Sequence, residues 1–128
     1  MDILIDASCV MAILAEEPER DEVIEKTKGA TLVSATCLPY EIANALSARV
    51  KRHLADEETA VLAYSEFEKI PIRLFDVDIK KALRIAAEEK HYAYDAYYIA
   101  CALDRKLPLS SFDKGLIEIA QKRGVKCL

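Results

Sequence analysis

The order of apolar and polar positions divides the chain into short strand-like runs and longer segments with helical periodicity. Strands are expected at Asp2–Ile5, Thr31–Ser34, Ile72–Phe75, Leu107–Ser110 and Val125–Leu128. Helices are expected at Ser8–Glu16, Pro18–Lys28, Pro39–Leu54, Asp56–Lys69, Asp78–Lys90, Tyr92–Lys106 and Asp113–Arg123. Because helices separate most of these strands, crossover connections and parallel pairing are favoured. We therefore expect a three-layer α/β/α sandwich around a central, mainly parallel sheet of about five strands.

Two of the expected helices have informative faces. In the helix that starts at Pro39, one face is apolar and carries Ile42, Ala43, Leu46, Val50 and Leu54, and the opposite face carries Glu41, Asn44, Ala48 and Arg52. The segment from Ala96 to Leu103 is apolar nearly all round, which is typical of a buried helix. Asp56 and Asp78 stand where N-caps are expected.

Length and composition fit one domain over residues 1–128. Apolar residues make up 52% of the chain and charged residues 31%, which excludes a disordered composition. No apolar run approaches the roughly 20 residues needed to span a bilayer. Met1 is followed at once by Asp2 and a strand, which leaves no room for a signal peptide. We expect a cytoplasmic protein that does not associate with membranes.

The remaining composition excludes several kinds of site. The four cysteines, Cys9, Cys37, Cys101 and Cys127, form no close pair, and with two histidines a zinc site is disfavoured. Buried free thiols are the preferred interpretation. Three glycines do not make a glycine-rich phosphate loop. The net charge of −4 excludes a surface that is basic all over, but it leaves room for a local nucleic-acid contact.

Four acidic residues stand at the ends of predicted elements. Asp6, Glu41 and Asp113 follow expected strands, and Asp95 starts the buried helix. Taken singly, each has a structural explanation as a helix cap or a first-turn acid. A parallel sheet, however, brings strand ends to one edge, where clustered carboxylates repel each other unless cations bind. Oxygen-only ligands suit Mg²⁺ or Mn²⁺, and such ions assist phosphodiester hydrolysis.

Other polar residues near these acids have two interpretations. Ser110 and Ser111 are either turn hydroxyls or groups that orient a carboxylate. Arg49, Lys51 and Arg52 form the densest basic cluster, which is either a solvated helical face or a contact for an RNA backbone that leaves the site.

In these motifs the chain resembles PIN-domain nucleases, in particular the small VapC-type toxin ribonucleases. ILIDAS resembles the opening strand with its Asp-x-Ser element, here Asp6 and Ser8. LPYEIANAL, YDAYYIACAL and LPLSSFDKGL resemble the later motifs, with Glu41, Asp95 and Asp113. Ser111 departs mildly from the family, which often has threonine at that position.

The resemblance implies a PIN fold and RNA cleavage that depends on one or two Mg²⁺ or Mn²⁺ ions. It implies that Asp6 and Asp95 hold the principal ion, that Glu41 completes its shell, and that Asp113 holds a second ion or orients water. The expected supporting residues are Ser8, Asn44 and Ser111. Products with 5′-phosphate and 3′-hydroxyl ends are also implied.

The resemblance further implies partners. We expect a homodimer, with an interface on exposed apolar residues of the two early helices such as Val10, Ile13 and Leu14. An antitoxin protein that blocks the site is expected for a toxin.

Three rival interpretations remain. A PIN fold used for RNA binding or assembly without catalysis is the main one. A response-regulator receiver is disfavoured because the first strand ends in the single acid Asp6. A haloacid-dehalogenase-like motif at FDVDIK is disfavoured because Lys80 stands where a hydroxyl residue is needed, which leaves Asp78 as a helix cap.

Overall fold

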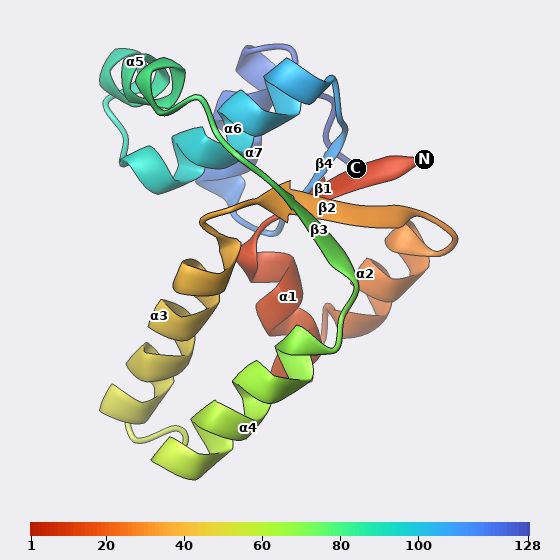
Figure 1. Cartoon of the computed structure of the whole chain (residues 1–128), viewed down its shortest axis with the longest axis vertical. Helices are drawn as coiled ribbons and strands as arrows, with labels where there is room; N and C mark the ends of the chain where they lie inside the picture. The colour runs from red at the N-terminus through yellow and green to blue at the C-terminus, as the bar shows by residue number, and fades with distance from the viewer.

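The computed structural model describes residues 1–128 and places one parallel sheet between two layers of helices (Figure 1). The sheet has the strand order β3-β2-β1-β4. Its strands are β1 (Asp2–Ile5), β2 (Thr31–Ala35), β3 (Ile72–Phe75) and β4 (Leu109–Ser110). All three pairings are parallel. The expected three-layer α/β/α sandwich is therefore confirmed.

Seven helices cover the two faces of the sheet. One layer contains α1 (Ala7–Leu14), α2 (Arg20–Thr27), α3 (Leu38–Lys51) and α4 (Glu57–Glu68), and the other contains α5 (Ile79–Glu89), α6 (Ala93–Arg105) and α7 (Lys114–Lys122). Each ends within a few residues of its expected bounds. Asp56 and Asp78 are N-caps as predicted, because their carboxylates accept the backbone N–H groups of Thr59 at 2.8 Å and Lys81 at 3.1 Å. None of the helices is long and apolar enough to cross a membrane.

The central strand β1 contributes to two separate cores. Ile3 and Ile5 are buried against α1, α2, α3 and α4. Leu4 points the other way and is buried among residues of α5, α6 and α7. A strand with both faces buried needs a continuous apolar run, which explains why the sequence shows one here instead of an alternation.

The C-terminal segment forms less of a strand than expected. Val125–Leu128 was expected to add a fifth strand, but only Cys127 pairs, through a single bridge to Leu109. The sheet therefore has four strands. The pairing partner β4 is itself only two residues long, so it offers little backbone for a further ladder.

Two expectations about helix surfaces are wrong. Leu54 is exposed, because α3 ends at Lys51 and His53 adopts a left-handed backbone with φ 60°, which breaks the helical register. Val10 is fully buried, because α1 packs against α2, α3 and α4 as well as against β1. Ile13 and Leu14 are half-buried against the same core. The proposed dimer interface on the early helices is therefore not available at Val10.

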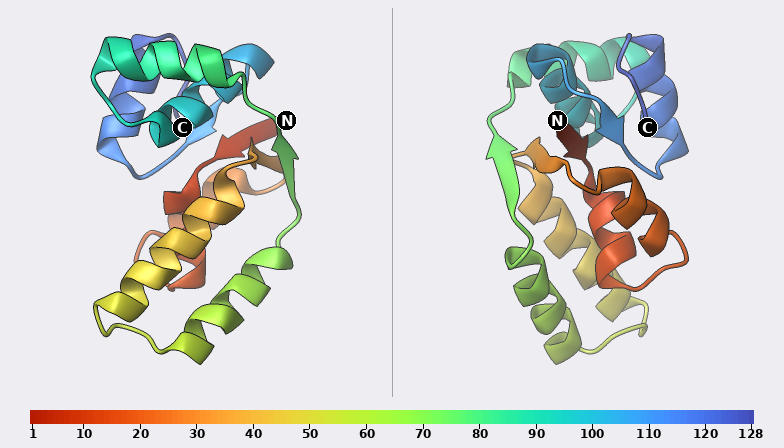
Figure 2. Two further views of the ribbon diagram at one scale, coloured as in Figure 1. Left: turned by 60° about the vertical axis from the view of Figure 1, so that its left-hand side comes forward. Right: turned by 90° about the vertical axis from the view of Figure 1, so that its right-hand side faces the viewer.

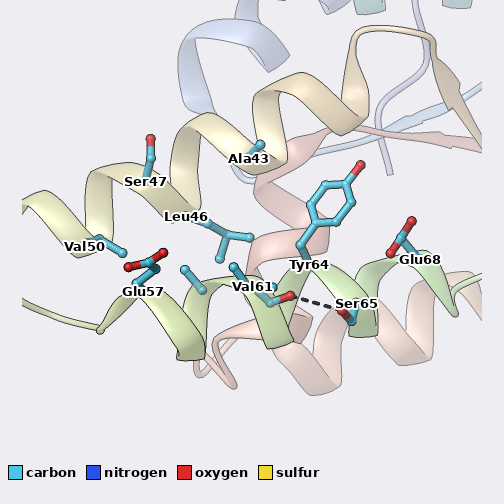
Figure 3. A pocket seen from close by; sticks show the side chains of 10 residues that line it. Ala43, Leu46, Ser47, Val50, Glu57, Val61, Tyr64, Ser65 and Glu68 are labelled. Carbon is cyan, nitrogen blue, oxygen red and sulfur yellow. Dashed lines mark hydrogen bonds between the residues drawn. The ribbon is translucent and has the colours of Figure 1, made fainter.

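The helices α3 and α4 pack side by side and project away from the sheet (Figure 2). Between them runs a groove of about 640 Å³ whose walls are mainly apolar (Figure 3). Leu46 and Val50 contribute from α3, and Val61 and Tyr64 from α4. The groove lies along the projecting pair of helices and has none of the four candidate acids in its walls.

The strand order fixes where a site is expected. The chain moves from β1 to β2 to β3 in one direction and then places β4 on the opposite side of β1. In open parallel sheets, ligands bind beyond the carboxyl ends of the strands where the order reverses in this way. Asp6 follows β1, and Ser111 and Asp113 follow β4. These residues therefore stand at the position that the topology favours for a site.

Candidate active site

Asp6 is buried at the end of β1 and is held through both of its carboxylate oxygens. The hydroxyl of Ser8 donates to Oδ1 and the hydroxyl of Ser111 donates to Oδ2, each at 2.6 Å. Oδ1 also accepts the backbone N–H of Cys9 at 3.3 Å, which makes Asp6 the N-cap of α1. Asp6 can therefore be both the cap of α1 and part of a site.

The two serines are oriented by the backbone after β4. The Phe112 N–H donates to Ser8 Oγ and the Asp113 N–H donates to Ser111 Oγ, both at 2.9 Å. Because each hydroxyl oxygen accepts from the backbone, its proton is left to point at Asp6. Ser111 thus orients a carboxylate, which decides between the two interpretations of that residue.

Glu41 lies in the first turn of α3 and is bonded to the opposite layer. Its Oε2 accepts the phenolic hydrogen of Tyr98, a residue of α6 that is itself almost fully buried. Burial raises the pKa of Glu41, the Tyr98 hydrogen bond lowers it, and repulsion from Asp6, Asp95 and Asp113 raises it further. Glu41 is therefore within electrostatic range of all three other acids.

Asp95 lies in the first turn of α6, but it is not the cap of that helix. The N-cap position is Tyr92, and the Asp95 carboxylate is hydrogen-bonded to His91 Nε2. The cap explanation for Asp95 is therefore wrong. Burial raises the pKa of Asp95, repulsion from Asp113 adds to this, and His91 lowers it.

Asp113 caps α7 and is the most exposed of the four acids. Its Oδ1 accepts the Leu116 N–H at 3.1 Å. A side-chain carbon added at Gly115 would lie 3.4 Å from Asp113 Oδ1 and 3.8 Å from His91 Cε1, so both groups border the same small space. The pair formed by His91 and Asp95 therefore lies beside Asp113.

The four acids share one region, but they do not form a closed coordination shell. Burial is the main cause that raises the pKa of Asp6, and repulsion from Asp113 adds a smaller increase. The hydrogen bonds from Ser111, Ser8 and the Cys9 N–H lower this pKa but do not cancel the effect of burial. No three acidic, histidine or cysteine side chains converge closely enough to hold a metal ion as they stand. Glu41 and Asp95 instead face Tyr98 and His91. The carboxylates supply oxygen donors, which are the ligands that Mg²⁺ and Mn²⁺ prefer.

The remaining predicted residues lie further along α3. Asn44 is exposed one turn after Glu41, and no hydrogen bond joins its side chain to the acids. Arg49, Lys51 and Arg52 lie at the far end of the helix, about 12–16 Å along its axis from Glu41. The structure therefore does not bring the basic cluster to the carboxylates, and its contact with RNA stays a prediction.

Comparison with family models decides the classification. The model of the PIN domain matches residues 3–122, which is nearly the whole chain. This chain belongs to the PIN domain family. The predicted resemblance is thereby confirmed, and the receiver and dehalogenase-like interpretations are excluded. A search of curated proteins finds no match.

Solved structures share this PIN fold at low sequence identity. PAE2754 from Pyrobaculum aerophilum is 23% identical with a TM-score of 0.74, and the match covers 99% of this chain and 83% of that one. VapBC2 from Rickettsia felis, bound to a promoter DNA fragment, is 11% identical with a TM-score of 0.69 and coverages of 100% and 98%. The sarcin-ricin-loop-cleaving toxin VapC20 of Mycobacterium tuberculosis is 14% identical, with a TM-score of 0.65 and coverages of 96% and 95%.

Two residues that contact the candidate acids were not predicted from the sequence. Tyr98 is three positions after Asp95, so the two share a helix face, and that spacing was a usable signal. His91 is four positions before Asp95, but it precedes the first residue of α6, so helical spacing alone did not place it. Tyr98 holds Glu41 in its orientation through a hydrogen bond, and His91 holds Asp95 in the same way.

Proposed function

We propose that this PIN domain is a Mg²⁺- or Mn²⁺-dependent endoribonuclease and acts as the toxin of a toxin–antitoxin pair. The observation that carries the proposal is the state of Asp6. This buried carboxylate stands at the reversal of strand order, is fixed by Ser8 and Ser111, and is electrostatically coupled to Glu41 and Asp113. Burying a negative charge and placing other negative charges near it costs free energy, and a bound cation offsets that cost.

Each acid has a distinct part in the proposal. Asp6 and Asp95 hold the principal ion, and Glu41 completes its shell after leaving Tyr98. Asp113 is the most accessible acid, and it either holds a second ion or orients the attacking water. When bound, such an ion supplies positive charge that stabilises the phosphoryl transition state and lowers the pKa of water.

The proposed reaction is hydrolysis of an RNA phosphodiester without a covalent enzyme intermediate. The oxygen of water forms a new bond to phosphorus, and the bond from phosphorus to the 3′-oxygen breaks. The leaving 3′-oxygen takes up a proton, so the products carry 5′-phosphate and 3′-hydroxyl ends. Ser8 and Ser111 do not touch the substrate in this scheme, because their protons are directed to Asp6.

The partner in the proposal is an antitoxin. The similar structures include VapBC2 of Rickettsia felis and FitAcB of Neisseria gonorrhoeae, the latter 15% identical with a TM-score of 0.69 and coverages of 98% and 96%. We place an amphipathic antitoxin segment in the groove between α3 and α4, where Leu46, Val50 and Val61 supply an apolar floor (Figure 3). Helix-in-groove binding uses apolar walls of this kind.

A homodimer is also part of the proposal. With Val10 buried, the interface has to lie outside the core-facing surface of α1. Sedimentation velocity over a wide concentration range measures the oligomeric state directly, and a monomer at every concentration would rule out the homodimer.

A cleavage assay with added and removed metal tests the proposed activity. Purified protein is incubated with a fluorescent RNA in chelator and then with excess Mn²⁺ or Mg²⁺. The proposal expects no cleavage in chelator, cleavage on adding metal, and 5′-phosphate ends on the products. RNA binding without cleavage in every metal would instead support a non-catalytic PIN module.

A further inference from the structure

Two arginines from different elements lie against one aromatic ring at the outer edge of the sheet. Arg73 belongs to β3, which is an edge strand (Figure 1), and its Cζ is 5.2 Å from the centroid of the Phe75 ring. Arg105, at the end of α6, has its Cζ 3.7 Å from the same centroid. Arg73 and Phe75 are two residues apart on the strand, so their side chains leave it on the same face. We refer to Arg73 and Arg105 as the arginine pair.

No acid neutralises the arginine pair, and both of its members are exposed. Asp104 precedes Arg105 in the sequence, but its carboxylate is ion-paired with Lys81 of α5. Asp76 follows Phe75, but it forms no ion pair with either arginine. It lines a separate groove, whose walls include four tyrosines from α3, α4 and α6. The arginine pair therefore carries two positive charges and N–H donors that are free to bind a ligand.

The geometry of the arginine pair suits a phosphate group. Two positive charges beside one ring repel each other, and an anion bound between them offsets that repulsion. The Phe75 ring attracts each guanidinium and restricts its rotation, so less conformational entropy is lost when a ligand binds. A guanidinium presents paired N–H donors that match the oxygens of a phosphate. Because both Cζ atoms lie within 5.2 Å of one centroid, a single phosphate can contact both.

The register of the sheet relates the arginine pair to the candidate acids. Arg73 is paired with Val33, and Val33 with Leu4, so Asp6 lies two strands across and two residues further along. Strands are about 4.8 Å apart and rise about 3.3 Å per residue, so the Cα atoms of Arg73 and Asp6 are roughly 12 Å apart. A phosphate at the arginine pair is therefore not the one that lies at the acids, but it can belong to the same RNA strand.

We propose that Arg73 and Arg105 together bind one phosphate of the RNA backbone, a short distance along the strand from the bond that is cut. This inference rests on the proposed function, because it adds a second contact to the same substrate. A contact with the backbone fixes where the RNA lies on the protein without selecting a base sequence. An RNA too short to reach from the acids to the arginine pair lacks this contact.

Binding is measured in chelator by fluorescence anisotropy, so that the RNA is not cut. The double variant Arg73→Gln with Arg105→Gln should bind RNA about tenfold more weakly than wild type. Its slope of log Kd against log salt should fall by about one, because one phosphate contact is lost. Replacing both arginines by lysine keeps the charges but removes the planar donors, so the salt slope should stay while the affinity falls. Arg84→Gln is the matched control, because Arg84 is exposed on α5 and has neither a ring nor an acid as partner.

Uncharged methylphosphonates in place of single phosphodiesters identify the phosphate that is bound. Replacing one linkage away from the cut bond should weaken binding to wild type, and the same replacement should leave binding to the double glutamine variant unchanged. A loss of the same size in that variant would show that another group binds this phosphate, and it would overturn the inference. If the double glutamine variant loses binding of inorganic phosphate but binds RNA as wild type does, the arginine pair binds a free anion and the inference is wrong.

The remaining outcomes separate this inference from the proposed activity. Equal RNA binding by wild type and the double glutamine variant, or an equal loss in Arg84→Gln, would overturn the phosphate contact. Metal-dependent cleavage alongside either result would leave the nuclease intact. RNA binding that depends on the arginine pair, without cleavage in any metal, would overturn the nuclease and leave the phosphate contact intact. Circular dichroism checks that all variants are folded, which is expected because the substituted side chains are exposed.

Discussion

Ser111 donates a 2.6 Å hydrogen bond to Asp6 across 105 residues of sequence. The contact exists because β4 pairs with β1, which places the residues after both strands at one edge of the sheet. Asp6 is consequently held from two directions, by Ser8 of its own helix and by Ser111 of the C-terminal segment. The geometry of the candidate site therefore depends on the docking of β4.

Ser111→Ala should lower both stability and cleavage. It removes a hydrogen bond to a buried carboxylate, which typically costs about 1.5–3 kcal/mol of the free energy of unfolding, and it leaves Asp6 free to rotate. The control is Ser34→Ala, which removes an equally buried hydroxyl that donates to the Ile5 carbonyl at 2.6 Å. Urea unfolding should report a smaller loss for Ser34→Ala, because its hydroxyl bonds a neutral carbonyl, and cleavage rates should fall only for Ser111→Ala. Equal cleavage rates for the two variants would show that Ser111 is structural alone.

Tyr98→Phe should shift the pH dependence of cleavage. The Tyr98 hydrogen bond lowers the pKa of Glu41, so its loss raises that pKa further. If the metal-free protein needs ionised Glu41 to bind the ion, the acidic limb of the pH–rate profile at subsaturating Mn²⁺ moves to higher pH while the rate on the alkaline side changes little. Tyr97→Phe is the control, since Tyr97 is the next residue of α6 but donates no hydrogen bond to an acid. Superimposable profiles for Tyr98→Phe and wild type would count against the role of Glu41.

The metal-free protein should lose stability as pH rises above the ordinary pKa of its site acids. The pKa of Asp6 is raised in the folded state from an ordinary value of 3.8, so the folded protein binds more protons than the unfolded chain between the two values. The stabilising contribution of protonated Asp6 is present below pH 3.8 and disappears as pH rises through the raised pKa.

Asp6→Asn removes the carboxyl group whose ionisation lowers the free energy of unfolding. The variant should therefore be more stable than wild type at neutral pH in chelator. The difference between the two unfolding free energies, measured by urea titration from pH 4 to 8, should grow with pH. Saturating Mn²⁺ should stabilise wild type by about 2.7 kcal/mol at 100 times the Kd and should stabilise the variant much less. A difference that is flat with pH would contradict the assigned environment of Asp6.

Val61→Glu should abolish binding of the antitoxin and leave cleavage unchanged. Val61 is 57% exposed in the groove between α3 and α4, and a carboxylate there cannot be covered by an apolar segment. Leu62→Glu is the matched control, because Leu62 is 64% exposed on the same helix but does not line the groove. Co-purification with the product of the neighbouring reading frame measures binding. Retention of that protein by Val61→Glu would place the partner elsewhere.

Much of the fold was predictable because local signals agreed with each other. The continuous apolar run of β1 and the caps at Asp56 and Asp78 marked their elements correctly. Val10 was assigned to the wrong surface because α1 is apolar nearly all round, so its pattern does not say which face is covered. Whether Val125–Leu128 forms a strand depends on how much backbone β4 offers for pairing. The sequence of the segment itself does not contain that information.

The candidate site was predictable in its acids and less so in their partners. Asp6 and Asp113 were located by their positions after strands, which is a local signal. The bond from Tyr98 to Glu41 joins residues 57 positions apart on opposite layers, and no periodicity encodes it. Tyrosines that gather into one groove from α3, α4 and α6 were likewise unpredictable, since only the packing of those helices brings them together.

We expect Asp6 to act through its charge and not only as a helix cap. Asp6 and Asp78 are both N-cap residues. The Asp6 carboxylate accepts the Cys9 N–H at 3.3 Å, and the Asp78 carboxylate accepts the Lys81 N–H at 3.1 Å. Only Asp6 is buried beside other acids. The decisive measurement is cleavage of one fluorescent RNA in Mn²⁺ by wild type, Asp6→Asn and Asp78→Asn, with folding matched by circular dichroism. We predict that Asp6→Asn is inactive and that Asp78→Asn cleaves at close to the wild-type rate. Full activity in Asp6→Asn would contradict a metal-binding role for the Asp6 carboxylate.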